Sequence, residues 1–94
     1  MLRFSFARSF DKSLKSYHSH EKVLIQRSVD SFMMALDAGQ IPQGFGLTKM
    51  AEHLWECRAD IKTRILFTRR KSFVDFLFVG NHHEVRLFIK HYLS

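Results

Sequence analysis

The sequence has little of several features that would define its class. It contains one cysteine, Cys57, among 94 residues, so no disulfide can form within the chain, as is typical of a protein from a reducing cytoplasm. No apolar run approaches the roughly 18 residues that a membrane-spanning helix needs. Acidic residues are few, with 9 Asp and Glu against 15 Lys and Arg. We therefore expect a cytoplasmic protein without a membrane role. Its charge favours an anionic partner, although a simple excess of lysine on a soluble surface is the plainer explanation.

The length and composition predict one domain over residues 1–94. Hydrophobic residues make up 46% of the chain, and 10 residues are phenylalanine, so even a chain of this size can bury a dense core. There is no internal repeat, linker or low-complexity segment.

The first half predicts a strand followed by two helices. Residues 2–7 alternate apolar with polar or small side chains, as in a half-buried strand. Ser9 is expected to cap a short helix, and Ser19 a second helix that stops at Gly39. Residues 39–46 are predicted to form a loop. The second helix has an apolar stripe at helical spacing: Ile25, Val29, Phe32, Met33 and Leu36.

The second half predicts three strands over 53–58, 61–68 and 72–79, and a closing helix over 82–92. The short connections indicate an antiparallel meander. Residues 72–79 are apolar on both faces, which is typical of a central strand covered on both sides. The element order is β-α-α-β-β-β-α, an α+β fold in which the helical hairpin covers one face of the sheet.

Strand alternation assigns polar side chains to the two faces of the sheet. On 53–58, Glu56 and Arg58 share the face opposite Trp55. On 61–68 the more apolar set, predicted to face the core, is Ile61, Thr63, Ile65 and Phe67. The opposite set, which is predicted to lie on the open face, is Lys62, Arg64, Leu66 and Thr68. The register between strands stays open, because a one-residue slip exchanges the faces.

Arg64 is the most informative single residue, because it interrupts an otherwise apolar strand. A guanidinium there can donate two parallel hydrogen bonds to a phosphate. It can also stabilise the extra negative charge of a pentacovalent phosphorane. The alternative is a structural arginine paired with Glu56 or Asp75.

His82 and His83 directly follow the third strand, at a position where functional groups are common. Histidine titrates near neutral pH, so either residue can serve as a general acid or base. Cleavage of RNA through its own 2′-hydroxyl needs a base for that hydroxyl, a cation for the phosphate and an acid for the leaving 5′-oxygen. His82, Arg64 and Arg58 can supply part of this set. The alternative is that one histidine caps the last helix and the other is solvated.

Further basic residues extend the positive surface around these groups. The run at 69–71 is predicted to be a hairpin tip that grips a nucleic-acid backbone, or else a solvated turn. The residues expected to bind RNA or the ribosome are Lys62, Arg69, Arg70, Lys71, Arg86 and Lys90.

The histidines do not predict a metal site. His82 and His83 with Glu84 and the distant His53 do not show a known ligand spacing, and one cysteine is too few for structural zinc. Cys57 is expected to be a small buried hydrophobe. No metal or other cofactor is expected.

Several segments resemble the RelE/ParE superfamily of toxins from bacterial toxin–antitoxin pairs. Members often have a Leu-aromatic-Glu-Leu-Arg strand, matched here by residues 54–58, Leu-Trp-Glu-Cys-Arg. They follow it with an aromatic-Arg-aliphatic-aliphatic-aromatic strand, matched by residues 63–67, Thr-Arg-Ile-Leu-Phe. Residues 10–15 are similar to the family's first helix. The resemblance covers nearly the whole chain, including the element order.

The resemblance implies a ribosome-dependent endoribonuclease that cleaves mRNA in the A site, inhibits translation and is neutralised by a cognate antitoxin. It implies that Arg64 binds the scissile phosphate, with Arg58 assisting. His82 lies in a strand-end Gly-x-His similar to that of YafQ-type members, where the histidine is catalytic, and His83 or Glu56 would assist it. The implied partners are the antitoxin, mRNA and ribosomal RNA, with a higher-order toxin–antitoxin complex also open.

Two other functions stay open. ParE-type members share the fold but inhibit DNA gyrase and lack the ribonuclease residues, so the presence of both Arg64 and His82 argues against that branch. The other hypothesis is a basic binding module without catalytic activity. RelE itself has a lysine-rich strand where this chain has Leu54 and Glu56, so the acid–base assignment stays open, and Glu56 is either a base or the partner of Arg64.

Overall fold

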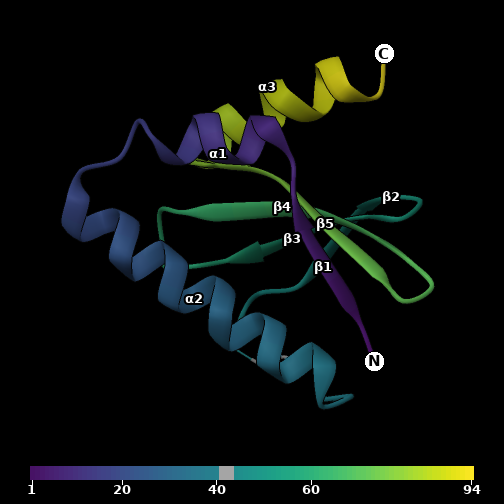
Figure 1. Cartoon of the computed structure of the whole chain (residues 1–94). Coiled ribbons are helices and arrows are strands. Elements are labelled where there is room, and N and C mark those ends of the chain that lie inside the picture. The colour runs from purple at the N-terminus through teal and green to yellow at the C-terminus, as the bar shows by residue number, and fades with distance from the viewer. Residues whose placement is uncertain (41–43) are drawn as a thin grey trace.

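The structure is a computed structural model that describes residues 1–40 and 44–94. These residues form one five-stranded sheet with three helices, in an α+β fold that confirms the predicted class (Figure 1). Residues 41–43, in the predicted loop, lie outside the described residues. The elements are β1 (Arg3–Phe6), α1 (Arg8–Leu14), α2 (Ser19–Asp37), β2 (Thr48–Ala51), β3 (Leu54–Arg58), β4 (Arg64–Arg70), β5 (Phe73–Gly80) and α3 (His82–Tyr92).

The strands lie in the order β1-β5-β4-β3-β2. β2 to β5 form an antiparallel meander, and β1 pairs with β5 in parallel. A parallel pair requires a long connection, and the one between β1 and β5 contains α1, α2 and the strands β2 to β4. β5 is therefore an inner strand with a partner on each side, as its apolar sequence predicted.

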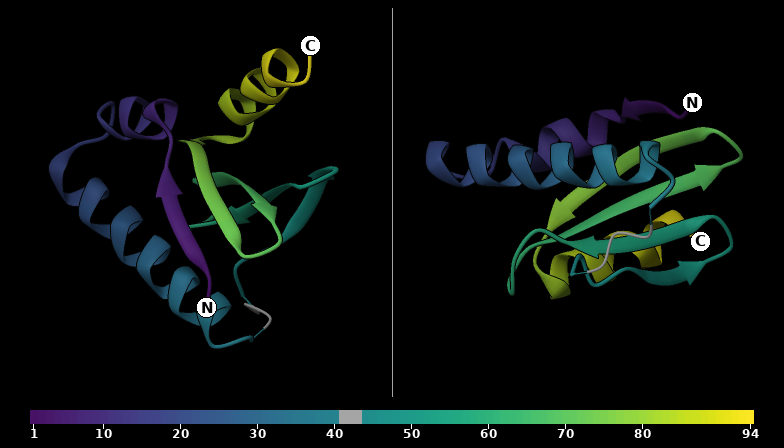
Figure 2. Two further views of the ribbon diagram at one scale, coloured as in Figure 1. Left: turned by 45° about the vertical axis from the view of Figure 1, so that its right-hand side comes forward. Right: turned by 90° about the horizontal axis from the view of Figure 1, so that it is seen from below.

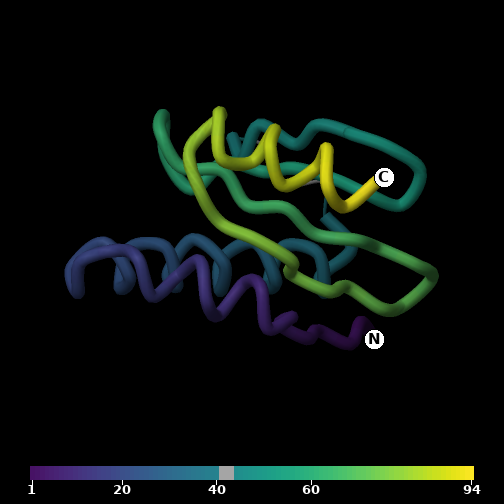
Figure 3. The backbone as a smooth tube through the Cα atoms, turned by 90° about the horizontal axis from the view of Figure 1, so that it is seen from above, coloured from purple at the N-terminus to yellow at the C-terminus, as the bar shows by residue number. Residues whose placement is uncertain are grey.

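Helices cover both faces of the sheet, and Figures 2 and 3 show α3 and α2 on opposite sides of the strands. Beneath α2 the core contains Phe32, Phe67 and Phe76, each at most 2% exposed. Beneath α3 a second cluster contains Leu54, Leu66 and Val85. The prediction that the helical hairpin covers one face is correct, and α3 covers part of the other.

Three strand predictions need correction. β2 was not predicted, because Thr-Lys-Met-Ala shows no apolar alternation on this edge of the sheet. β4 begins at Arg64 rather than at residue 61, and Ile61, predicted to face the core, is 90% exposed. Leu66, predicted on the open face, is fully buried beneath α3.

The predicted serine caps are also wrong, for a reason that involves β5. Ala7 and His18 occupy the N-cap positions of α1 and α2. β1 ends at Phe6, so beyond that point β5 lacks a strand partner on this side. The Ser9 hydroxyl donates to the carbonyl oxygen of Leu77, and the Ser13 hydroxyl oxygen accepts from the backbone N–H of Val79 at 3.0 Å. Serines of α1 thus satisfy backbone groups that would otherwise be orphaned.

The end of α2 agrees with the prediction. α2 ends at Asp37, and Gly39 adopts a positive φ of 73° just beyond it, which is the usual glycine termination that the sequence predicted. In the described part of the chain, no helix combines the length and apolar character needed to cross a membrane.

Candidate functional site

A buried ion pair is the central polar feature of the sheet face that carries α3. Glu56 on β3 accepts a hydrogen bond from the Nη1 of Arg64 on β4, with 2.8 Å between Nη1 and Oε1. The side chains are 6% and 17% exposed. Charges with so little contact with water persist only when they are paired. The structure therefore supports the pairing of Arg64 with Glu56 over the pairing with Asp75, which instead accepts from the Ser5 hydroxyl.

The protein does not use the full hydrogen-bonding capacity of Arg64. A guanidinium carries five N–H donors. The Nε atom is buried and has no hydrogen-bond partner among the described residues. One edge of the guanidinium is fixed by Glu56, so the group is held in place while donors remain unmatched.

A second arginine lies next to this pair. The β3–β4 register places Arg58 directly opposite Arg64, and like charges in this relation repel one another unless an anion or solvent separates them. Arg58 is exposed at the end of β3. Its aliphatic stem packs against Gly46, where a Cβ atom would lie 3.0 Å from the Arg58 Cδ. Gly46 has a φ of 58°, so it supplies both a turn and room for this side chain.

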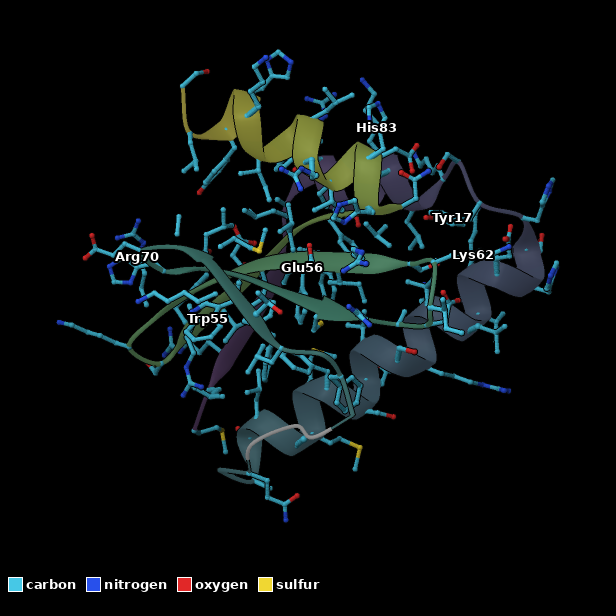
Figure 4. The ribbon with its side chains drawn as sticks, turned by 180° about the vertical axis from the view of Figure 1, so that it is seen from behind. Tyr17, Trp55, Glu56, Lys62, Arg70 and His83 are labelled. Carbon is cyan, nitrogen blue, oxygen red and sulfur yellow. The ribbon has the colours of Figure 1, made fainter. Side chains whose placement is uncertain are left out.

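The start of α3 brings the two histidines to the same end of the sheet. β5 pairs Gly80 with Arg64, and His82 follows two residues later as the first residue of α3. Both histidines are exposed, and Figure 4 shows His83 at the start of α3. No hydrogen bond or ion pair within the described residues joins either histidine to Arg64 or Glu56.

Neither histidine caps α3, because Asn81 does so. The Asn81 side chain accepts from the Glu84 N–H at 2.8 Å, and the Glu84 carboxylate accepts from the Asn81 N–H at 2.9 Å. At Gly80 a Cβ would lie 2.9 Å from the Phe78 ring and 3.0 Å from the Glu84 Cβ. The absence of a side chain at Gly80 thus permits the tight turn that carries the chain from β5 to His82.

Lys62 was predicted to lie in a strand over 61–68, but it lies in the turn before β4. The Asp60 carboxylate accepts from the backbone N–H groups of Lys62 and Thr63, at 2.8 Å each, and this turn delays the start of β4. Lys62 is exposed and lines a cavity with Tyr17 and Glu84. Figure 4 shows Lys62 and Tyr17 at the same end of the sheet.

Tyr17 also belongs to this region, and it lies in the loop between α1 and α2. Its burial raises the pKa of the phenol, and the Glu84 carboxylate raises it further, whereas a hydrogen bond with Thr63 lowers it. The phenol therefore stays protonated at neutral pH. Nothing in the sequence pattern around Tyr17 indicated that the loop between α1 and α2 would bring it close to Glu84 at the start of α3.

The remaining predicted residues fall into two groups. Arg86 and Lys90 are exposed on α3, which extends the positive surface from His82. Arg69 and Arg70 lie within β4, and only Lys71 belongs to the tight β4–β5 turn, so the predicted three-residue basic tip needs correction. Arg69 and Lys71 line a pocket with Trp55 on the other face of the sheet.

Cys57 belongs to the core beneath α2. Cys57 is 1% exposed, and burial, with a smaller effect of Glu56, raises the pKa of its thiol to about 12. It is a buried apolar residue, as predicted, rather than a nucleophile. Within the described residues, no cluster of three or more His, Cys, Asp or Glu side chains is arranged to hold a metal ion.

Solved structures share this architecture. YafQ in the Escherichia coli DinJ–YafQ complex superposes with a TM-score of 0.70 at 10% identity, over 90% of this chain and 98% of that one. A copper-bound mutant toxin from Helicobacter pylori gives 0.68 at 16% identity, over 90% and 99%. The archaeal RelE–RelB complex from Pyrococcus horikoshii contains a chain that gives 0.65 at 16%, over 85% and 93%.

The chain has the RelE-like fold. No protein-family model matches the sequence, and no curated protein sequence matches it either. At these identities the similarity establishes the fold, and in the RelE-like fold of this chain the pair Glu56–Arg64 lies on the sheet face that α3 partly covers.

Proposed function

We propose that this chain is the toxin of a toxin–antitoxin pair and that it cleaves mRNA on the ribosome without a metal ion. The observation that carries the proposal is the fixed Arg64 guanidinium, held by Glu56 and opposite Arg58 at the end of the sheet where His82 begins α3. The fold supports it, since neighbours with this fold form complexes with the antitoxins DinJ and RelB.

The chemistry requires no group from outside the chain except the RNA and the ribosome. The substrate's 2′-hydroxyl loses its proton to a base, and its oxygen attacks the adjacent phosphorus. The bond to the 5′-oxygen breaks, that oxygen takes up a proton, and a 2′,3′-cyclic phosphate remains. Arg64 and Arg58 supply positive charge where the phosphorane becomes more negative. His82 supplies or accepts a proton, with His83 or Glu56 assisting.

The remaining cations have a separate role in this proposal. Lys62, Arg70, Arg86 and Lys90 are all exposed, and they would bind the phosphate backbone of the ribosome or mRNA without reading sequence. A cognate antitoxin of acidic, amphipathic character would neutralise this surface.

The decisive test uses purified protein, freed of any antitoxin, in a translating extract with mapped mRNA 5′ ends. We expect new cleavage sites that appear only when ribosomes translate the message. If no cleavage occurs but DNA gyrase supercoiling is inhibited, the function belongs to the ParE branch instead. If neither activity is seen, the proposal of a toxin is wrong.

Replacement of His82 by glutamine is expected to slow cleavage about 100-fold, the size of effect typical of a lost general acid or base. Because His82 is exposed at the first position of α3, the substitution should leave the melting temperature unchanged. The matched control is His91→Gln, which makes the same change at an exposed position near the other end of α3. Equal, small effects of both substitutions would remove His82 from the proposed mechanism.

A further inference from the structure

A second basic site lies on the opposite face of the sheet from Arg64. A pocket of about 350 Å³ is lined by Leu36, Leu47, Trp55, Phe67, Arg69 and Lys71, and we call it the Trp55 pocket. Strand alternation places Trp55 and Glu56 on opposite faces of β3. Figure 4 shows Trp55 near Arg70 and away from Lys62, so the pocket also lies toward the other end of the sheet.

The Trp55 pocket combines an aromatic floor with a cationic rim. Trp55 is half-buried and packs against the core beneath α2. The Nζ of Lys49 lies 5.9 Å from the centroid of the Trp55 ring. Arg69 and Lys71 are exposed, so the pocket reaches the surface. Among the described residues, no carboxylate lies within 4.0 Å of these three cationic groups.

The backbone of Lys71 adds an independent observation. Lys71 has a φ of 55° in the β4–β5 turn, a conformation that glycine adopts freely and that strains other residues. This backbone conformation places the cationic side chain of Lys71 at the rim of the pocket. A glycine there would relieve the strain and remove the charge, which makes Lys71→Gly a variant that should fold at least as well as the wild type.

We propose that the Trp55 pocket binds a nucleotide of single-stranded RNA, with one base stacked on Trp55 and the flanking phosphates held by the rim cations. Tryptophan stacks on any base, and basic side chains beside it track the backbone, which is the usual design of single-strand binding sites. An acidic peptide would use the cations but not the aromatic surface. The site goes beyond the proposed cleavage site, from which it is separated by the sheet itself.

Trp55 is the chain's single tryptophan, so tryptophan fluorescence, excited at a wavelength that tyrosine does not absorb, reports on this pocket alone. Titration of the purified protein with a short oligouridine RNA is expected to quench the fluorescence in a saturable way. The same oligomer without its bases should bind about tenfold more weakly or worse, since stacking supplies much of the affinity. No ribosome is present, so the result is independent of whether the protein cleaves mRNA.

Variants separate the pocket from general charge attraction. Arg69→Gln and Lys71→Gly should each weaken RNA binding about fivefold and make its salt dependence less steep by about 0.7 in the log–log slope, as for one lost phosphate contact. The matched control is Lys12→Gln, which removes one charge on α1 beside the opposite end of β5. A loss of RNA binding with Lys12→Gln equal to that with Arg69→Gln would overturn the proposal. Quenching of the fluorescence by oligoglutamate would also overturn it, as would equal affinity for the oligomers with and without bases.

Discussion

Replacement of Arg64 by alanine is expected to abolish mRNA cleavage, with a loss of about 100- to 1000-fold. A guanidinium that stabilises charge as it develops in the transition state contributes on this scale. The substitution also leaves Glu56 buried without its partner, at a cost of about 3–5 kcal/mol in the free energy of unfolding. Cleavage in the translating extract and thermal unfolding must therefore be measured on the same preparation.

A double substitution separates the two effects of the Arg64 change. Arg64→Leu together with Glu56→Leu replaces the buried pair by apolar side chains, which often leaves stability unchanged or higher. We expect this variant to fold and to remain inactive. Cleavage at the wild-type rate by the folded double variant would show that the pair is purely structural and would contradict the proposed mechanism.

Glu56→Gln decides between the two roles left open for Glu56. The amide oxygen can still accept a hydrogen bond from Arg64, so a residue that only positions Arg64 should tolerate the change with less than about a tenfold loss of cleavage. A general base cannot tolerate it, because an amide does not take up the proton, and the loss would then reach about 100-fold or more. The 2.8 Å contact in the free protein favours the positioning role.

The sequence was sufficient for those elements whose apolar pattern is strong. The stripe at Ile25, Val29 and Phe32 predicted α2 and its buried face correctly. The apolar run of β5 predicted a strand covered on both faces. By contrast, the four residues of β2 lie at an edge and are at most half-buried, so no hydrophobic alternation was present to predict them.

The residues of the candidate site were harder to place, because their relations depend on register and turns. Glu56 was predicted as one possible partner of Arg64, but only the observed register selected it. The early start predicted for β4 was wrong because the Asp60 carboxylate accepts hydrogen bonds from two backbone N–H groups and forms a turn there. The alternation of apolar and polar residues gives no sign of these hydrogen bonds. The pairing of Trp55 with Arg69 in one pocket likewise depends on register across β3 and β4.

The largest effect on stability is expected from Phe76. Its ring lies against those of five other phenylalanines, with centroid distances from 5.1 to 6.5 Å: Phe4, Phe6, Phe10, Phe32 and Phe67. These rings come from β1, α1, α2 and β4, so Phe76 connects β5 to most of the fold. Phe76→Ala would leave a cavity that cannot collapse easily, at a cost of about 3–5 kcal/mol in the free energy of unfolding.

The measurement is a thermal melt of Phe76→Ala beside a matched surface variant. We expect the melting temperature to fall by on the order of 20 °C for a domain of this size. Phe73→Ala makes the same change at the start of the same strand, where the residue is 47% exposed, and should alter stability by only about 0.5 kcal/mol. Similar losses for both variants would contradict the assignment of Phe76 as the centre of the core beneath α2.

The Phe76 experiment also tests whether the two faces of the sheet are independent. Phe76 packs beneath α2, whereas Glu56 and Arg64 lie on the face that carries α3. A milder change, Phe76→Leu, should lower stability while the protein still folds at moderate temperature. Cleavage per folded molecule should then equal that of the wild type, because the register that places Gly80 opposite Arg64 is held by the backbone of β4 and β5. A loss of cleavage without unfolding would show that the core beneath α2 sets the position of the site across the sheet.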